Sequence, residues 1–278
     1  MLSREVRNCA VEGDGLEDDG QTEDCLSSME LPPRQRITLV VVVILIVDPH
    51  MMKSSLPTLI CPSLLSCDLS NLSRDAQEML DYGADWLHMD VMDGHFVPNL
   101  TFGPPVIASL RKSVEGYIDC HLMVSEPAKW VGPLAKAGAD GFTFHLESDM
   151  PEGGVPAMIQ MVRDAGMKVG MVIKPGTAVE GLMPYAKDLD MVLIMTVEPG
   201  FSGQKFMADQ MPKVKALREA FPDLTIQVDG GLSPSTIDAA AEAGANCIVA
   251  ASAIFGSDDR KGVIETLRAG VDKYKETQ

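Results

Sequence analysis

The sequence predicts an α/β fold: one barrel of parallel strands, each followed by a helix, behind a non-barrel N-terminal extension. Eight short apolar stretches recur after residue 57 of the 278-residue chain. Amphipathic stretches with helical spacing lie between them, and the repeating region is long enough for one barrel. Strands that alternate with helices favour a parallel sheet. Eight such repeats predict a single (β/α)8 TIM barrel over residues 58–278.

The order of the expected elements follows the chain. The expected strands are residues 58–62, 86–91, 117–123, 141–145, 168–173, 191–196, 225–228 and 247–250. Helical periodicity marks residues 72–82, 127–137, 155–165, 208–220 and 235–243, and residues 260–274 form a closing helix. A Gly-Ala-Asp or Gly-Ala-Asn step begins at Gly83, Gly138 and Gly244, where a helix ends and a strand begins. Because glycine suits a helix C-cap, we expect turns here, at the stability face of the barrel.

Residues 1–57 differ from the rest. Positions 11–30 hold eight acidic residues and no Lys or Arg, and residues 37–47 are apolar apart from Thr38. This run is too short for a bilayer span, which needs about 20 residues. Arg34 and Arg36 fit a signal peptide, whereas the acidic leader does not. We expect a disordered or weakly ordered extension; a signal anchor, organelle targeting and a start at Met51 or Met52 remain open alternatives.

The charge and the cysteine content of the chain argue against several classes of partner and of cellular location. The formal net charge is −17, from 23 basic and 40 acidic residues. This charge argues against a nucleic-acid partner and against an anionic membrane surface. An anionic substrate would therefore need a local source of positive charge, such as helix N-termini or a metal ion. The six cysteines form no CxxC pair, so we expect reduced thiols and a cytoplasmic protein.

Ionisable side chains gather at the expected C-terminal ends of strands, where barrels of this kind place their functional groups. His88 and Asp90 are two residues apart and therefore share one strand face. His121 ends the third strand and Asp229 the seventh. Two imidazoles and two carboxylates suit one divalent ion, such as zinc, iron(II), manganese or cobalt.

Two further histidines, His145 and His95, lie close to the C-terminal ends of the expected strands. His145 ends the fourth strand, and Glu147 lies two residues on. We expect a supporting or structural role for His145 and keep direct metal binding as the minor alternative. His95 lies in the loop after the second strand, where it either covers the site or serves as a plain loop residue.

Small residues follow the last three strands. The turns contain Gly200–Gly203, Gly230-Gly231 and Ala251-Ser252. Such turns let backbone N–H groups approach a phosphate, so we expect a phosphate site there. Three methionines face the same mouth by position and would shield a carbanion-like intermediate from water: Met92, Met123 and Met195.

These residues lie in motifs that closely resemble ribulose-phosphate 3-epimerases. The matching stretches include ICPSLLSCDLSNL, LHMDVMDGHFVPNLTFGP, HLMVSEP, FTFHLES, MTVEPGFSGQKF and VDGGLSPSTI. They follow one another in order over all eight units. Only the first 57 residues lie outside the resemblance.

The resemblance implies the interconversion of D-ribulose 5-phosphate and D-xylulose 5-phosphate in the pentose phosphate pathway. It implies metal binding by His88, Asp90, His121 and Asp229. Asp90 and Asp229 would also carry the proton at C3 through an ene-diolate. Substrate contacts are implied at Ser63, at the two histidines, at the three methionines and at the phosphate turns: Gly200, Phe201, Ser202, Gly203, Gly230, Gly231, Ala251 and Ser252. A homo-oligomer is implied as well.

Ser202 and Ala251 depart from the glycines usual at these positions, which leaves the phosphate fit open. A ketohexose 6-phosphate epimerase is the nearest alternative, since the chemistry would be the same. A non-catalytic sugar-phosphate sensor would not need a second carboxylate. A decarboxylase or isomerase on a related barrel would use a lysine, and Lys174 ends the fifth strand.

Overall fold

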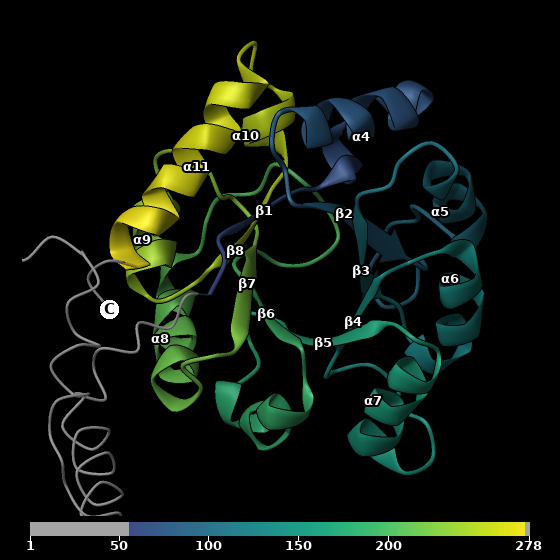
Figure 1. Ribbon diagram of the computed structural model, residues 1–278. Helices are drawn as coiled ribbons and strands as arrows, with labels where there is room; N and C mark the ends of the chain where they lie inside the picture. The colour runs from purple at the N-terminus through teal and green to yellow at the C-terminus, as the bar shows by residue number, and fades with distance from the viewer. Residues whose placement is uncertain (1–55, 276–278) are drawn as a thin grey trace, which may run out of the picture. The chain divides into compact units, whose positions relative to one another are not determined.

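Eight strands form one parallel sheet in the computed structural model, which describes residues 56–275 (Figure 1). They are β1 (Leu59–Pro62), β2 (Trp86–Met92), β3 (Tyr117–Met123), β4 (Gly141–His145), β5 (Lys168–Ile173), β6 (Met191–Met195), β7 (Thr225–Asp229) and β8 (Cys247–Ala250). The sheet order is β1-β8-β7-β6-β5-β4-β3-β2. A parallel bridge between Ser63 and His88 joins the two edges, β1 and β2. The predicted barrel is therefore confirmed.

Helices cover the outside of the sheet (Figure 1). They are α4 (Leu72–Asp81), α5 (Pro104–Arg111), α6 (Val131–Ala137), α7 (Gly154–Asp164), α8 (Met211–Ala220), α9 (Ile237–Glu242), α10 (Ser252–Phe255) and α11 (Arg260–Lys275). The sequence did not single out α5, which begins with two prolines. Proline suits the first turn of a helix, where its missing N–H leaves no hydrogen bond unmade.

The expectation of a helix after every strand is wrong after β5. Two 3-10 segments stand there, η5 (Val179–Gly181) and η6 (Met183–Asp188). Gly181 and Pro184 interrupt the segment, since glycine weakens a helix and proline cannot donate its backbone hydrogen bond. The predicted segments 127–137 and 208–220 likewise begin with 3-10 turns before α6 and α8.

The predicted extension lies outside the described residues, apart from Leu56 and Pro57. The same holds for the apolar run 37–47, for the possible starts at Met51 and Met52, and for two of the six cysteines. Among residues 56–275, no helix combines the length and apolar character that crossing a bilayer requires. The four cysteines in this range are free thiols.

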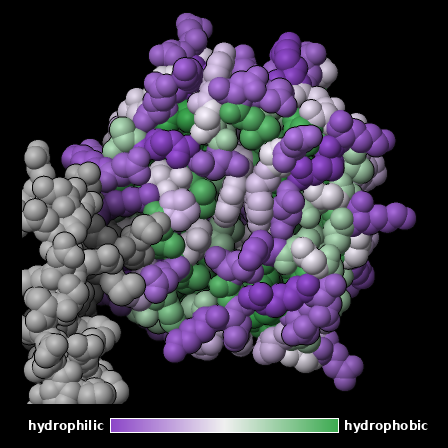
Figure 2. Space-filling view, viewed as in Figure 1, coloured by the Kyte–Doolittle hydropathy of each residue, from purple (hydrophilic) through white to green (hydrophobic). Residues whose placement is uncertain are grey.

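The main core lies between the outer face of the sheet and the helices, and includes Ile60, Leu87, Phe142 and Phe144. Smaller apolar clusters fill the barrel interior. Hydrophilic side chains cover much of the face seen in Figure 2. Because strand side chains alternate, the inward face of β2 carries His88, Asp90 and Met92 while the outward face packs on the core.

A repeated contact holds the N-terminal ends of the even-numbered strands. The residue just before each of these strands is Asp or Asn, and its side-chain oxygen accepts the backbone N–H of the second residue of the preceding strand. The pairs are Asp85 with Ile60 (2.7 Å), Asp140 with Ile118 (2.8 Å), Asp190 with Val169 (3.0 Å) and Asn246 with Ile226 (2.9 Å). Each Asp or Asn also donates its own N–H to the same strand residue.

An arginine completes each contact, and it comes from the helix that follows the previous even-numbered strand. The pairs are Arg111 with Asp140, Arg163 with Asp190, Arg218 with Asn246 and Arg268 with Asp85. Three of these arginines also donate to the carbonyl of the glycine in the Gly-Ala-Asp or Gly-Ala-Asn step. The contact therefore repeats four times around the barrel, at the end opposite the expected site.

Candidate active site and metal centre

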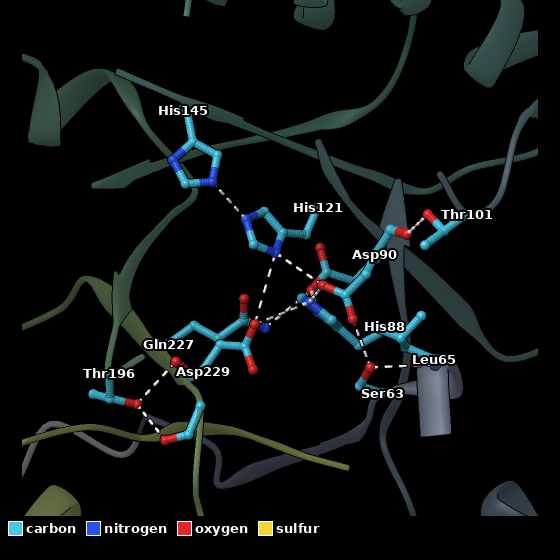
Figure 3. Close-up of polar contacts among 12 residues, drawn as sticks. Ser63, Leu65, His88, Asp90, Thr101, His121, His145, Thr196, Gln227 and Asp229 are labelled. Carbon is cyan, nitrogen blue, oxygen red and sulfur yellow. Dashed lines mark hydrogen bonds and ion pairs between the residues drawn. The ribbon is translucent and has the colours of Figure 1, made fainter. Parts of the chain in front are cut away.

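Four ionisable side chains from three strands meet at the C-terminal end of the barrel (Figure 3). His88 and Asp90 come from β2, His121 from β3 and Asp229 from β7. One nitrogen or oxygen from each lies within 4.8 Å of the others. The register of β2 and β3 pairs Asp90 with His121, which brings these two side chains together. The four predicted metal ligands thus form one cluster.

Both carboxylates face the same two imidazole nitrogens. Nε2 of His88 is 3.4 Å from Oδ1 of Asp90 and 3.8 Å from Oδ2 of Asp229. Nδ1 of His121 is 3.1 Å and 3.7 Å from the same two oxygens. Both histidines are fully buried, and the side chain of Asp229 is 15% exposed. The only partly open member of the cluster is therefore a carboxylate.

The environment separates the acidities of the two aspartates. Burial opposes ionisation of Asp90, but the charges and hydrogen bonds of His88 and His121 outweigh it and hold its pKa well below the usual range. Burial and then repulsion by Asp90 raise the pKa of Asp229 to about 6. Burial would lower the pKa of His88, yet Asp90 and Asp119 outweigh it and raise this pKa well above its ordinary value. The cluster therefore favours positive charge at its centre.

Asp119 contacts His88 on the side of the ring that faces away from the two aspartates, and Gln227 contacts Asp119. Nδ1 of His88 lies 2.9 Å from Oδ2 of Asp119, and Gln227 donates its Nε2–H to the same oxygen at 2.9 Å. A carboxylate can only accept, so Nδ1 of His88 carries the proton. Among the described residues, Nε2 of His88 is buried without a hydrogen-bond partner. This nitrogen points at the two aspartates.

His145 and Glu147 lie behind His121. The Nε2 atoms of His121 and His145 are 3.0 Å apart, and Nδ1 of His145 is 3.2 Å from Oε2 of Glu147. Burial lowers the pKa of His145 to about 4. Burial works against the ionised form of Glu147, but hydrogen bonds from His145, Thr177 and the Lys174 N–H lower its pKa to about 2. His145 is thus neutral and touches the cluster only through His121.

Hydroxyl groups hold the two aspartates in place. Ser63 donates to Oδ2 of Asp90 at 2.6 Å, and Thr101 donates to the Asp90 carbonyl. Thr196 donates to the carbonyls of Asp229 (2.8 Å) and Gly230 (2.6 Å). Hydroxyl groups from other elements therefore hold the Asp90 carboxylate and the backbone of both aspartates.

A cavity of about 320 Å³ opens beside the cluster. Asp90 and Asp229 line it, whereas His88 and His121 lie behind them. All the other predicted substrate contacts line this one cavity: Ser63, Met92, Met123, Met195, Gly200, Phe201, Ser202, Gly203, Gly230, Gly231, Ala251 and Ser252. Glu198 and Gln204 line it as well, without having been predicted.

The turn after β7 requires glycine for steric reasons. Gly230 and Gly231 have φ values of +120° and +70°. A Cβ on Gly230 would lie 2.4 Å from Cγ2 of Val197, and one on Gly231 would lie 2.4 Å from the backbone N of Phe206. The backbone therefore reaches the cavity wall without side chains in between.

Sequence reasoning missed the supporting residues. Asp119 lies two residues before His121, and Gln227 two before Asp229, so each shares its neighbour's strand face. That spacing could have identified them. Thr101 lies in a loop, where spacing carries no such signal, and Thr196, expected as the last residue of a strand, follows the end of β6. Lys174 lies outside the cavity lining, with its Nζ 3.7 Å from the centre of the Phe96 ring. His95 is exposed and hydrogen-bonds within its own loop to Asp93.

The cluster fits a divalent metal ion. It offers two imidazole nitrogens and two carboxylate oxygens, a donor set that zinc and iron(II) accept. The carboxylate behind His88 and the imidazole behind His121 are the kind of outer partners that orient metal-binding histidines. Nε2 of His88 is buried without a hydrogen-bond partner in the described part of the chain, which supports the same conclusion.

The chain is similar to known epimerases over most of its length. Residues 59–255 match the model of the "Ribulose-phosphate 3 epimerase family". The cytoplasmic isoform of ribulose-phosphate 3-epimerase from Oryza sativa subsp. japonica is 56% identical over 216 residues, covering 77% of this chain and 94% of the relative. The ribulose-phosphate 3-epimerase of Schizosaccharomyces pombe is 49% identical over 222 residues, covering 79% and 96%.

A solved structure supports the fold alone. The 3-hexulose-6-phosphate synthase from Salmonella typhimurium is 17% identical, with a TM-score of 0.56, covering 78% of this chain and 99% of the other. The barrel, its site and the relatives together define an isomerase that acts on carbohydrates. More narrowly, the chain belongs to the ribulose-phosphate 3-epimerase family.

Proposed function

We propose that this chain interconverts D-ribulose 5-phosphate and D-xylulose 5-phosphate by moving one proton at C3 between Asp90 and Asp229. The observation that carries the proposal is the pair of carboxylates on β2 and β7, which face each other across two shared imidazole nitrogens and line one cavity. Epimerisation needs a base on one face of C3 and an acid on the other.

His88, Asp90, His121 and Asp229 would hold one divalent ion. When bound, the ion would supply electrostatic stabilisation to the negative charge that develops on the substrate oxygens. The protein contributes the orientation of the donors. Asp119 binds Nδ1 of His88 and so turns Nε2 toward the ion, and Ser63 holds the far oxygen of Asp90.

The two aspartates would exchange roles with the direction of reaction. Asp90 removes the C3 proton in one direction, and Asp229 returns a proton to the opposite face. The opposite pKa shifts of the pair support this division, because one carboxyl group must be ionised while the other holds a proton. The ene-diolate formed between the two transfers needs protection from water, which the buried Met92, Met123 and Met195 would provide.

The phosphate would bind at the other end of the cavity, against the turns after β6, β7 and β8. Gly230 and Gly231 support this placement, since their backbone lines the wall without side chains. Ser202 and Ala251 also line this part of the cavity. Both are small, so backbone N–H groups would remain accessible to the phosphate oxygens.

Turnover in heavy water tests the proposal. We expect deuterium at C3 of both sugar phosphates with the intact enzyme. Asp229→Asn should lose net epimerisation, whereas the exposed Asp149→Asn should keep it. Near-normal epimerisation by Asp229→Asn would contradict the two-carboxylate mechanism.

Substrate length and catalytic competence need separate measurements. We expect higher kcat/KM with five-carbon than with six-carbon ketose phosphates, and the reverse order would identify a ketohexose 6-phosphate epimerase. Tight binding of sugar phosphate without turnover would instead indicate a sensor.

The rice relative is named a cytoplasmic isoform, which supports a cytoplasmic location for this chain. That the chain forms a homo-oligomer stays a prediction, and sedimentation would measure the number of subunits.

A further inference from the structure

The turn after β6 is held by a residue from the opposite side of the barrel. Asn99, in the loop after β2, donates its Nδ2–H to the carbonyl of Gly200 at 2.8 Å. In the closed sheet, β3, β4 and β5 separate β2 from β6 on one side, and β1, β8 and β7 separate them on the other. This hydrogen bond therefore joins loops from opposite sides of the barrel mouth.

Close packing accompanies the bond. A Cβ on Gly200 would lie 3.5 Å from Cβ of Val97, so the two loops are in contact. Val97 is buried in one apolar cluster with Met92 and Met123, which line the cavity. The loop that carries Asn99 thus has a fixed base beside the site.

A second side-chain amide holds the same turn from within. Gln204 donates its Nε2–H to the carbonyls of Glu198 at 2.6 Å and Phe201 at 2.9 Å. Together with Asn99, it occupies three carbonyl groups of the turn. Among the residues that the structure describes, the backbone N–H groups of Gly200–Gly203 donate no hydrogen bond. The turn therefore combines occupied acceptors with free donors, which suits an anion.

Peptide geometry links the occupied carbonyls to the free N–H groups. In a trans peptide unit, the carbonyl and the following N–H point in opposite directions. The bond from Asn99 to the carbonyl of Gly200 therefore turns the N–H of Phe201 away from Asn99. The bond from Gln204 to the carbonyl of Phe201 likewise sets the direction of the Ser202 N–H. Phe201 and Ser202 line the cavity, whereas Asn99 does not.

We propose that Asn99 and Gln204 are positioning residues that fix the peptide units of the turn after β6 and so present the N–H groups of Phe201 and Ser202 to the substrate phosphate. This inference deepens the proposed function, because it rests on phosphate binding at this turn. Both amides act on the turn and not at C3, so they contribute to binding of the substrate and not to proton transfer.

Limited digestion with trypsin tests the positioning without substrate. Lys205 directly follows the turn and is exposed, so cleavage after it reports how firmly the turn is held. Loss of one hydrogen bond in Asn99→Leu should raise this cleavage rate about 2- to 10-fold. Cleavage after the exposed Lys112, which precedes β3 at the other end of the barrel, should not change. A wild-type rate after Lys205 would overturn the proposal.

Two substitutions isolate the lost donor. Asn99→Asp keeps an acceptor for the N–H of Leu100 but adds a charge, whereas Asn99→Leu adds none. An effect common to both variants comes from loss of the Nδ2–H donor. Asn71→Asp and Asn71→Leu are the matched controls, because the Asn71 amide donates only within its own loop, to Asp68 and Ser70. Neither control should change cleavage after Lys205.

Inorganic phosphate, used as the probe, tests the consequence for binding. It should slow cleavage after Lys205 in the wild-type chain, and Asn99→Leu should need about 2- to 10-fold more phosphate for the same protection. No protection of the wild type, or equal protection of the variant, would overturn the proposal. Protection without any epimerisation would contradict the proposed function alone.

Steady-state kinetics with D-ribulose 5-phosphate tests the same consequence during turnover. Asn99→Leu and Gln204→Leu should raise KM about 2- to 10-fold and keep kcat near wild type, as loss of uniform binding does. A merely structural role would instead lower the amount of folded enzyme and hence kcat. Gln160→Leu is the control, because the exposed Gln160 amide donates to Asp164 on its own helix. Lower kcat at unchanged KM would overturn the proposal.

Discussion

The carboxylates of Asp90 and Asp229 face the same two nitrogen atoms, Nε2 of His88 and Nδ1 of His121. The two aspartates come from β2 and β7, strands that are not neighbours in the sheet. Their shared contacts explain why their acidities differ: the histidines lower the pKa of Asp90, and the charge of Asp90 adds to burial in raising that of Asp229. The same cluster therefore gives its two carboxyl groups different acidities.

Metal removal should lower both stability and turnover. An ion that binds only the folded chain stabilises it by about 4 kcal/mol at 1,000 times its Kd. We expect a chelator to lower the thermal midpoint and abolish epimerisation, and added Zn²⁺, Mn²⁺, Co²⁺ or Fe²⁺ to restore both. Asp229→Asn should show a smaller gain on metal addition. Unchanged midpoint and turnover after verified metal removal would count against a metal centre.

Removal of the Ser63 hydroxyl should slow the reaction. Ser63→Ala takes away the donor at 2.6 Å from Oδ2 of Asp90. A hydrogen bond to a charged group contributes about 1.5–3 kcal/mol, so kcat should fall about 10- to 100-fold. Ser66→Ala is the matched control, because the buried Ser66 hydroxyl has no hydrogen-bond partner within the described range. Equal kcat values for the two variants would show that the Ser63 hydroxyl does not contribute to the reaction.

A methyl group at Gly230 should disrupt the turn after β7. Its Cβ would lie 2.4 Å from Val197, at a φ of +120°. Strain of this kind costs about 1–3 kcal/mol. We expect a lower thermal midpoint and a raised KM for the sugar phosphate. Gly132→Ala, in α6 with open space around its Cβ, should instead keep KM and raise stability slightly. A normal KM in Gly230→Ala would argue against this turn as the phosphate site.

Asp140 should matter for stability and not for chemistry. Asp140→Ala removes the acceptor of the buried Ile118 N–H and the partner of Arg111. An unsatisfied buried donor costs about 1–3 kcal/mol. We expect a lower free energy of unfolding with kcat and KM near wild type, since the contact lies at the opposite end of the barrel. The exposed Asp258→Ala should change neither quantity. A large fall in kcat without loss of stability would contradict a purely structural role for Asp140.

Cys67 should react slowly in spite of its partial exposure. Burial, followed by the charges of Asp75 and Asp68, raises its pKa from 9.0 to about 11. The thiolate is the reactive form, so alkylation at pH 8 should be about 100-fold slower than in the unfolded chain. The rate should rise about tenfold per pH unit up to about pH 11. Peptide mapping after iodoacetamide treatment measures it, and rapid labelling at pH 8 would contradict the shifted pKa.

Strand positions were predictable because their periodicity is local. The spacing of His88 and Asp90 gave their common face, and the strand ends placed His121 and Asp229 at one mouth. The structure adds one residue to β2 and one to β7, and it leaves Thr58 out of β1 and Thr196 out of β6. The helix expected after β5 came only from the eightfold repeat of strand and helix, which took no account of Gly181 and Pro184.

The Gly-Ala-Asp steps show the limit of local reasoning. The sequence identified Gly138 and its equivalents as turns at the stability face, and the structure places them there. It did not indicate that Arg111 reaches Asp140, or that this contact recurs four times. Such pairs form only when helices from successive units pack around a closed barrel.

By itself, the sequence determined the eight-fold alternation, the composition of the strand ends and the glycine turns beside the cavity. These depend on the period of a strand, the period of a helix and the backbone freedom of glycine, all of which act over a few residues. Only the tertiary structure decided that Asp90 and Asp229 share two nitrogens, that Asp119 supports His88 and that Glu147 reaches His121 through His145. Acidity and tautomer depend on buried neighbours within a few ångströms, and closure of the barrel brings those neighbours from distant strands.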